Sequence, residues 1–329
     1  MPNNKKIKET DYLSFSAYFR GKEARLLSRD RLDRILSDGG YAEACRAASD
    51  AGYPDLSDAD VAGINAALEQ RLAEEMAEVR EMLPDAELMR LLCLEYDCHN
   101  AKVLVKSGGS LEKNASLFSD AGCYTPEELK AVYDDETGSG VLPTDFAEAI
   151  HESKSALART GNPQLSDFLL DKAYFALLLR EAEATGRPFL VNWVRNRIDK
   201  VNLRSLLRTL GMSRREEALR HALIDGGNVA LDELTDPSLT REDITRLYSV
   251  TIFDRASEES GMTAYEKASD NAEMEYISSA SLIPFGPEVA LEYVTALQSE
   301  IVALRIILTG KRMGIGAETL RERLRESYV

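Results

Sequence analysis

The stretch YDCHNAKVLVKSGG, residues 96–109, places an acid, a thiol and an imidazole side by side at Asp97, Cys98 and His99. Side chains of these types bind zinc or form nucleophile–base pairs. The chain has only three histidines and four cysteines, so each one is a candidate for such chemistry. A zinc site needs a fourth ligand, however, and the C-x4-C-H spacing that begins at Cys93 matches no structural zinc pattern. We therefore expect ordinary buried thiols here and no metal site.

The other two histidines, His151 and His221, have no Ser/Asp or Cys/Asn arrangement beside them that would make a catalytic set. The sequence therefore predicts no catalytic residue. A hydrolase that uses His99 or His151 is the enzymatic alternative, and it predicts an activity of the isolated chain that is lost when that histidine is changed to Ala.

Nucleotide binding is excluded by the glycine patterns. The Gly310-Lys311 pair has Arg305 where a phosphate-binding loop requires its first glycine, and no Ser or Thr follows the lysine. The segment MGIGAETL carries Thr319 where a dinucleotide fingerprint has its third glycine. We expect no cofactor.

Composition limits the partners and the compartment. The chain has 329 residues, a net charge of −16 and a pI near 4.8, which disfavours nucleic acid and anionic membrane surfaces. The opening MPNNKKIKET lacks a secretory apolar region, and no run approaches the ~20 apolar residues of a membrane span. We expect a cytoplasmic protein with reduced thiols and no direct membrane span.

Helical periodicity dominates the chain, and alternating β-branched runs are almost absent, so the sequence predicts an all-α fold. Ser57 is expected to cap the first long helix, with Asp60 three residues on. Three later helices are each expected to end at a glycine in the left-handed conformation. The expected long helices span residues 57–82, 85–107, 168–186, 187–211 and 287–310.

A frame of eight residues recurs three times at spacings of 102 and 101 residues. It reads acid, two variable residues, Asn or Ala, one variable residue, base, one variable residue, aliphatic. On a helix the acid, the fourth and the eighth position share one face, which would pack inward, while the base points away from them. The members are Asp97, Asn100 and Lys102; Asp199, Asn202 and Arg204; and Glu300, Ala303 and Arg305.

The repeat also bears on the histidine beside the first acid. His99 corresponds to Val201 and Val302, so two copies of the frame keep an aliphatic residue where the first has imidazole. The frame itself therefore needs no ligand or catalytic pair. Each repeat is long enough to be a domain of several helices, and we expect three such domains at 1–112, 113–213 and 214–329.

Residues 187–215 form a basic island, with eight cations against Asp199 alone and a local charge of +7. The main interpretations are internal pairing with the acidic helix at 69–87 and a contact surface for an acidic partner, and nucleic acid is the least favoured. The candidate partner surface consists of Arg195, Arg197, Lys200 and Arg208.

Four segments in the same order along the chain resemble the C subunit of V/A-type rotary ATPases, called d in the eukaryotic enzymes. The most specific is the closing stretch GPEVALEYVTALQSEIVALRIILTGKRMGI, followed by LRERLRESYV. The others are FSAYFRGKEARLLS, YDCHNAKVLVKSGG and WVRNRIDKVNLRSLLR. The third frame departs from the pattern at Ala303, where the other two have Asn.

The resemblance implies three similar helical domains around a pseudo-threefold axis, in a funnel with a central cavity. It also implies a non-catalytic central-stalk subunit of an ATP synthase or ATPase. Such a protein receives the axle subunits D and F and sits on the membrane rotor ring of proteolipid subunits, so that it is attached to the membrane only peripherally. The alternative is a free-standing helical-repeat adaptor for soluble partners, which would stack as an open superhelix.

Overall fold

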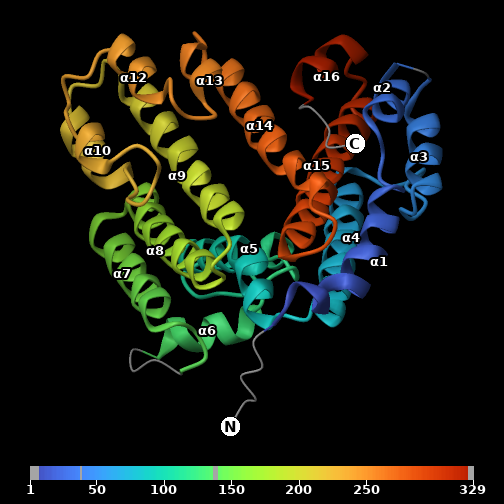
Figure 1. Ribbon diagram of the computed structural model, residues 1–329, viewed down its shortest axis with the longest axis horizontal. Helices are drawn as coiled ribbons and strands as arrows, with labels where there is room; N and C mark the ends of the chain where they lie inside the picture. Colours follow the sequence, from blue (N-terminus) through green and yellow to red (C-terminus); the bar gives the residue numbers. More distant parts are fainter. Residues whose placement is uncertain (1–6, 38, 136–139, 325–329) are drawn as a thin grey trace. The chain divides into compact units, whose positions relative to one another are not determined.

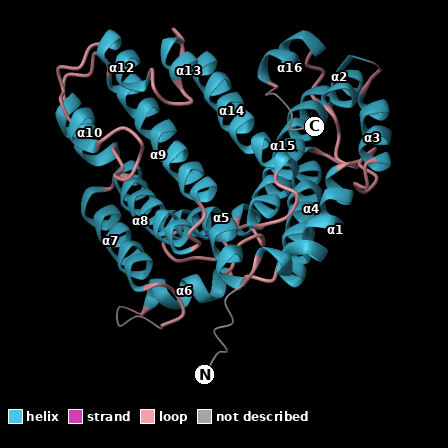
Figure 2. Cartoon of the chain, viewed as in Figure 1, coloured by secondary structure: helices cyan, strands magenta, loops and turns pink. Residues whose placement is uncertain are grey.

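The computed structural model describes residues 7–37, 39–135 and 140–324. Every regular element in these ranges is a helix, which confirms the all-α prediction (Figure 1, Figure 2). The first six residues of the opening segment and the last five of LRERLRESYV lie outside the described residues. No helix in the described ranges combines the length and the hydropathy needed to cross a bilayer.

The chain divides into two compact units. The terminal unit joins both ends of the chain, Met1–Met89 with Met274–Val329, and the central unit is Arg90–Glu273. The division passes through two helices, α5 (Ala86–Lys106) and α14 (Met262–Ser278). The three expected repeat domains remain a prediction.

In the terminal unit, one long helix is packed against most of the others. This helix, α15 (Pro287–Arg312), contacts α1, α2, α3, α4 and α16, and most of its residues are buried. Because a helix that is apolar on nearly every side must be surrounded, α15 is the core of this unit. The other elements are η1 (Glu9–Tyr12), α1 (Leu13–Glu23), α2 (Arg29–Ser37), α3 (Tyr41–Asp50), α4 (Val61–Met82), η3 (Ser279–Leu282) and α16 (Ala317–Arg323).

In the central unit, α8 (Pro163–Ala184) packs between α7 (Thr144–Thr160) and α9 (Pro188–Thr209), and α10 (Arg215–Ala222) contacts both α8 and α9. Leucines at the end of α9 form a core with Tyr248, Phe253 and Tyr265, all of them buried. The remaining elements are η2 (Ala115–Leu117), α6 (Pro126–Asp134), α11 (Leu231–Leu234), α12 (Arg241–Tyr248) and α13 (Asp254–Glu258).

Two predicted helix ends were wrong. Asp60, not Ser57, caps α4: its Oδ1 accepts the Gly63 N–H at 2.7 Å, while the Ser57 hydroxyl donates to Asp55. Gly186 and Gly211 follow α8 and α9 with φ of 64° and 80°, as expected. Gly310, however, lies inside α15, where a Cβ would come within 2.2 Å of Leu320 Cδ2. That glycine is required by the packing of α16.

A short contact between Arg20 and the buried Glu292 joins α1 to the start of α15. Arg20 Nη1 lies 2.5 Å from Oε2 of Glu292, whose side chain is fully buried. The other terminal nitrogen of Arg20 donates to the carbonyls of Ala280 and Ile283 at 3.1 Å each, which fixes the segment before α15. Burial raises the pKa of Glu292 from 4.5 to about 7, against the opposing effect of the Arg20 charge.

We expect Glu292 to make stability depend on pH. The folded carboxyl keeps its proton up to about pH 7 and the unfolded one only to 4.5. Its stabilising contribution is therefore complete below pH 4.5 and is lost as the pH rises through 7. Urea unfolding between pH 4.5 and 8 should show a steeper decline in the native chain than in Glu292→Gln, in which the raised pKa values of Glu300 and Asp199 still act. Equal pH slopes for the two proteins would contradict the assignment.

Candidate functional site

The three adjacent side chains Asp97, Cys98 and His99 point to three different parts of the central unit. His99 is exposed, with Nε2 2.8 Å from the carbonyl oxygen of Leu117. Cys98 is buried with its thiol toward the Leu170 carbonyl at 3.9 Å, and burial raises the pKa of the thiol to about 12. The thiol therefore stays protonated at neutral pH, and the trio does not form a reactive pair.

The other two histidines also stand apart. Nε2 of His151 lies 2.5 Å from the Val132 carbonyl oxygen, and His221 lies beside a pocket described below. Within residues 7–37, 39–135 and 140–324, no group of three or more His, Cys, Asp or Glu side chains could hold a metal ion.

The first repeat frame holds the loop that follows α5. Asp97, 1% exposed, accepts the N–H groups of Cys123 and Tyr124 at 2.9 and 3.1 Å. Asn100, fully buried, donates its amide to the Ser119 carbonyl at 2.8 Å and accepts the Ser119 N–H at 2.9 Å. Both side chains therefore act as a clamp on residues 119–124.

The second frame repeats this arrangement on α9. Asp199 accepts the N–H groups of Asn228 and Val229 at 3.1 and 3.2 Å, and the side-chain amide of Asn228 at 2.8 Å. Asn202 donates to the Ile224 carbonyl at 2.7 Å and accepts the Ile224 N–H at 2.8 Å. The second clamp therefore holds residues 224–229, which again follow the helix in the chain.

A glycine lies against the carboxylate in both clamps. A Cβ on Gly122 would come within 2.5 Å of Asp97 Oδ1, and one on Gly227 within 2.3 Å of Asp199 Oδ1. Such distances are far below van der Waals contact. The loop backbone can approach each acid only where it carries no side chain.

The third frame holds a segment from the opposite end of the chain. Glu300 accepts the N–H of Leu27, 273 residues earlier, and the hydroxyl of Tyr53 at 2.6 Å. Ala303 stands where the other frames have Asn, so the amide bonds of the clamp are missing here. Burial raises the pKa of Glu300, as it does that of Asp199, while the hydrogen bonds to both carboxylates act in the opposite direction.

In two of the three frames, the basic residue forms an ion pair with a carboxylate on a neighbouring helix. Lys102 Nζ lies 2.5 Å from Asp171 on α8, and Arg305 Nη2 lies 2.6 Å from Glu69 on α4. Arg204 makes no hydrogen bond or ion pair with any residue that the structure describes.

The basic side chains on α9 form ion pairs with carboxylates of the central unit. Arg197 pairs with Glu95 at 2.8 Å, and Lys200 lies 2.6 Å from both Asp270 and Glu273. The expected partners at 69–87 were therefore wrong for these cations. The remaining island contacts are Arg195 with Glu183 at 3.9 Å, Arg208 with Glu266 at 3.2 Å, Arg214 with Glu217 at 3.7 Å, and Arg215 with the carbonyls of Pro237 and Leu239.

Loss of one clamp amide is expected to lower stability strongly. Asn202→Ala leaves the buried N–H and carbonyl of Ile224 without partners, which costs about 2–4 kcal/mol of unfolding free energy. Ser205→Ala, on the same helix, is the control and should change it by less than about 0.5 kcal/mol. Denaturant unfolding checks both, and equal losses would show that Asn202 has no special role.

Adding one methyl group tests the glycine contact. Gly227→Ala forces a Cβ against Asp199, so we expect a loss of at least about 2 kcal/mol. Gly21 lies in an exposed part of α1 with no atom within 4 Å of its virtual Cβ. Gly21→Ala should therefore stabilise the chain by about 0.5–1 kcal/mol. A lower melting temperature for Gly227→Ala together with a higher one for Gly21→Ala would support the clamp. An unchanged melting temperature for Gly227→Ala would contradict it.

Comparison with known proteins identifies the family. A model of the ATP synthase (C/AC39) subunit family matches residues 15–323. The C subunit of a V-type sodium ATPase from Enterococcus hirae is 24% identical over 97% of this chain and 99% of its own length. The C subunits of A-type ATP synthases from Thermococcus onnurineus and Methanocaldococcus jannaschii are 26% and 24% identical, over 96% and 95% of this chain and 90% and 86% of their own. The chain therefore belongs to the C/AC39 subunit family of V/A-type ATP synthases.

Proposed function

We propose that this chain is a non-catalytic central-stalk subunit that couples the D–F axle to the membrane rotor ring. ATP synthesis or hydrolysis would thereby be linked to transport of protons or sodium ions. In this role the protein works in the cytoplasm and is attached to the membrane only through the ring. Membership of the C/AC39 family supports the proposal.

The observation that carries the proposal is the set of buried clamps, since a coupler must transmit torque without shearing. Each ion crossing the membrane delivers about 2.3 kcal/mol per 100 mV, and that load passes through the coupler. Asp97 and Asp199 tie long helices to the loops that follow them, and Glu300 ties α15 to the N-terminal segment. Fixed connections between close-packed helices resist shear.

We further propose that three repeat domains, 1–112, 113–213 and 214–329, close around a pseudo-threefold axis as a funnel. The recurrence of the frame at nearly equal spacing supports this arrangement. A funnel offers one surface to the ring and a socket to the axle, and an interface of about 1,600 Å² or more would hold either partner.

The basic island is a proposed part of the partner surface. Arg197 and Lys200 are mostly enclosed by their ion pairs, whereas the side chains of Arg195 and Arg208 are 42% and 56% exposed. Arg195 and Arg208 are therefore the members most accessible to an acidic partner.

Binding to purified partners tests the coupling role. The chain should form a complex with the D–F pair and another with the isolated ring, seen by co-elution in size-exclusion chromatography. Arg195→Glu combined with Arg208→Glu should weaken one of these complexes at least tenfold, because like charges oppose each other at an interface. Arg220→Glu, an exposed arginine outside the candidate surface, is the control.

A complex with neither partner would overturn the coupling role. Unchanged affinities of the double variant would remove Arg195 and Arg208 from the surface and leave the coupling role standing. In the reassembled enzyme, omission of the chain should abolish ATP-driven ion transport while hydrolysis by the catalytic subunits persists.

A further inference from the structure

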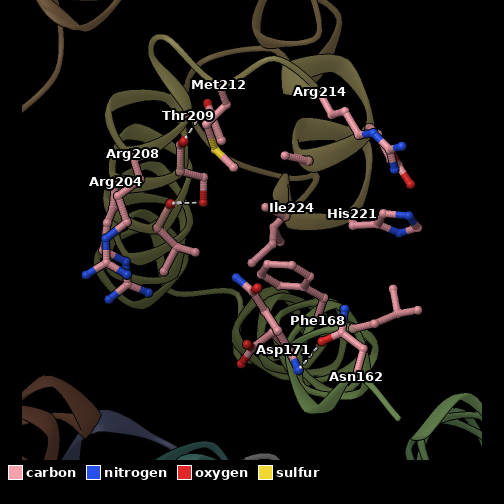
Figure 3. Close-up of a pocket in the computed structure, with 17 residues that line it drawn as sticks. Asn162, Phe168, Asp171, Arg204, Arg208, Thr209, Met212, Arg214, His221 and Ile224 are labelled. Atoms are coloured by element: carbon pink, nitrogen blue, oxygen red, sulfur yellow. Dashed lines mark hydrogen bonds and ion pairs between the residues drawn. The ribbon is translucent and has the colours of Figure 1, made fainter. Parts of the chain in front are cut away.

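A pocket of about 310 Å³ opens in the central unit between α8, α9 and α10 (Figure 3). Pockets of about 300–1,000 Å³ with mainly apolar walls and a few polar groups are the usual form of small-molecule sites. The apolar lining comes from all three helices and from the segment after α10. It includes Leu165, Phe168, Val201, Ala218, Ala222 and Ile224.

The cationic groups of the pocket lie at its edges. Figure 3 shows Phe168 and Ile224 in the middle of the lining residues, with Arg204 and Arg208 together at one edge. Arg214 and His221 lie at the opposite edge. A ligand that covers the apolar middle therefore reaches a cationic group with one of its ends.

Most charges around the pocket are already matched within the central unit. Asp171 lies 2.5 Å from Lys102, Arg208 lies 3.2 Å from Glu266, and Arg214 lies 3.7 Å from Glu217. Arg204 is the pocket arginine that pairs with no described residue. One unmatched positive charge favours a ligand with a single negative charge.

The repeat frame indicates what Arg204 lacks. The equivalent bases, Lys102 and Arg305, each pair with a carboxylate on a neighbouring helix, Asp171 and Glu69. In the second frame no described side chain supplies this carboxylate, and the pocket opens beside the arginine. A guanidinium accommodates a carboxylate through two parallel hydrogen bonds, so a carboxylate from outside the chain fits this position.

We propose that the pocket binds an amphipathic monoanion: an unbranched acyl chain of medium length that ends in a carboxylate. The carboxylate pairs with Arg204, and the chain lies over Phe168 and Ile224. The ligand proposal does not rest on the proposed coupling role, although Arg208 belongs both to the pocket edge and to the candidate partner surface. Its test uses the isolated chain, so failure of one proposal leaves the other standing.

Calorimetric titration of the full chain with octanoate tests the proposal, with octan-1-ol as the uncharged analogue. We expect saturable binding of one octanoate per chain and at least tenfold weaker binding of octan-1-ol. Arg204→Gln should weaken octanoate binding at least tenfold and leave octan-1-ol unchanged. Ala218→Trp fills the pocket and should abolish the binding of both.

Two matched variants locate the carboxylate. Arg220→Gln changes an arginine outside the pocket, and His221→Gln changes the opposite edge; both should keep the octanoate affinity of the native chain. Thermal unfolding of each variant verifies that it is folded. Arg204→Gln breaks no hydrogen bond or ion pair with a described residue, so it keeps the test valid if Ala218→Trp is unstable.

Three results would overturn the proposal. One is the absence of saturable octanoate binding in the millimolar range. Another is octanoate binding that survives Arg204→Gln unchanged, which would place the carboxylate elsewhere. The third is binding of an acidic amphipathic peptide at the pocket with no binding of octanoate, which would make the pocket a protein-docking site.

Discussion

A buried carboxylate that accepts main-chain N–H groups is the interaction on which this structure depends. Removing a carboxylate from water is costly unless hydrogen bonds replace the lost hydration. Asp97, Asp199 and Glu300 each receive at least two hydrogen bonds, most of them from main-chain N–H groups. The bonds form only when the donating segment lies in one position, so each acid fixes the path of the chain beside its helix.

The third clamp differs from the other two in where its segment comes from. The loop residues held by Asp97 and Asp199 follow these acids by 26–30 residues, whereas Glu300 holds Leu27 and Tyr53 from the start of the chain. Segments between the N-terminal helices thus take the place that a following loop takes in the first two frames. This exchange explains why the terminal unit is built from both ends of the chain around α15.

The charged side chains of α9 serve mainly to join helices within the central unit. Arg197 and Lys200 connect α9 to Glu95 on α5 and to Asp270 and Glu273 on α14. Partly buried ion pairs of this kind add little net stability, because the cost of desolvation offsets their attraction. Arg204 is the exception on the same helix, and its unmatched charge beside a pocket is what distinguishes the second frame from the first and third.

The sequence by itself determined the helices and the recurrence of the frame, because helical periodicity and the spacing of a frame are local properties of the chain. Tertiary structure alone decided what each frame holds. Nothing local distinguishes Ser119 or Leu27 as the partner of a buried side chain, since those contacts join residues 19 and 273 positions apart. The same reason explains two of the wrong predictions. Asp60 and Ser57 are both good caps by type, and the acids that pair with Arg197 and Lys200 come from α5 and α14, which sequence separation does not reveal.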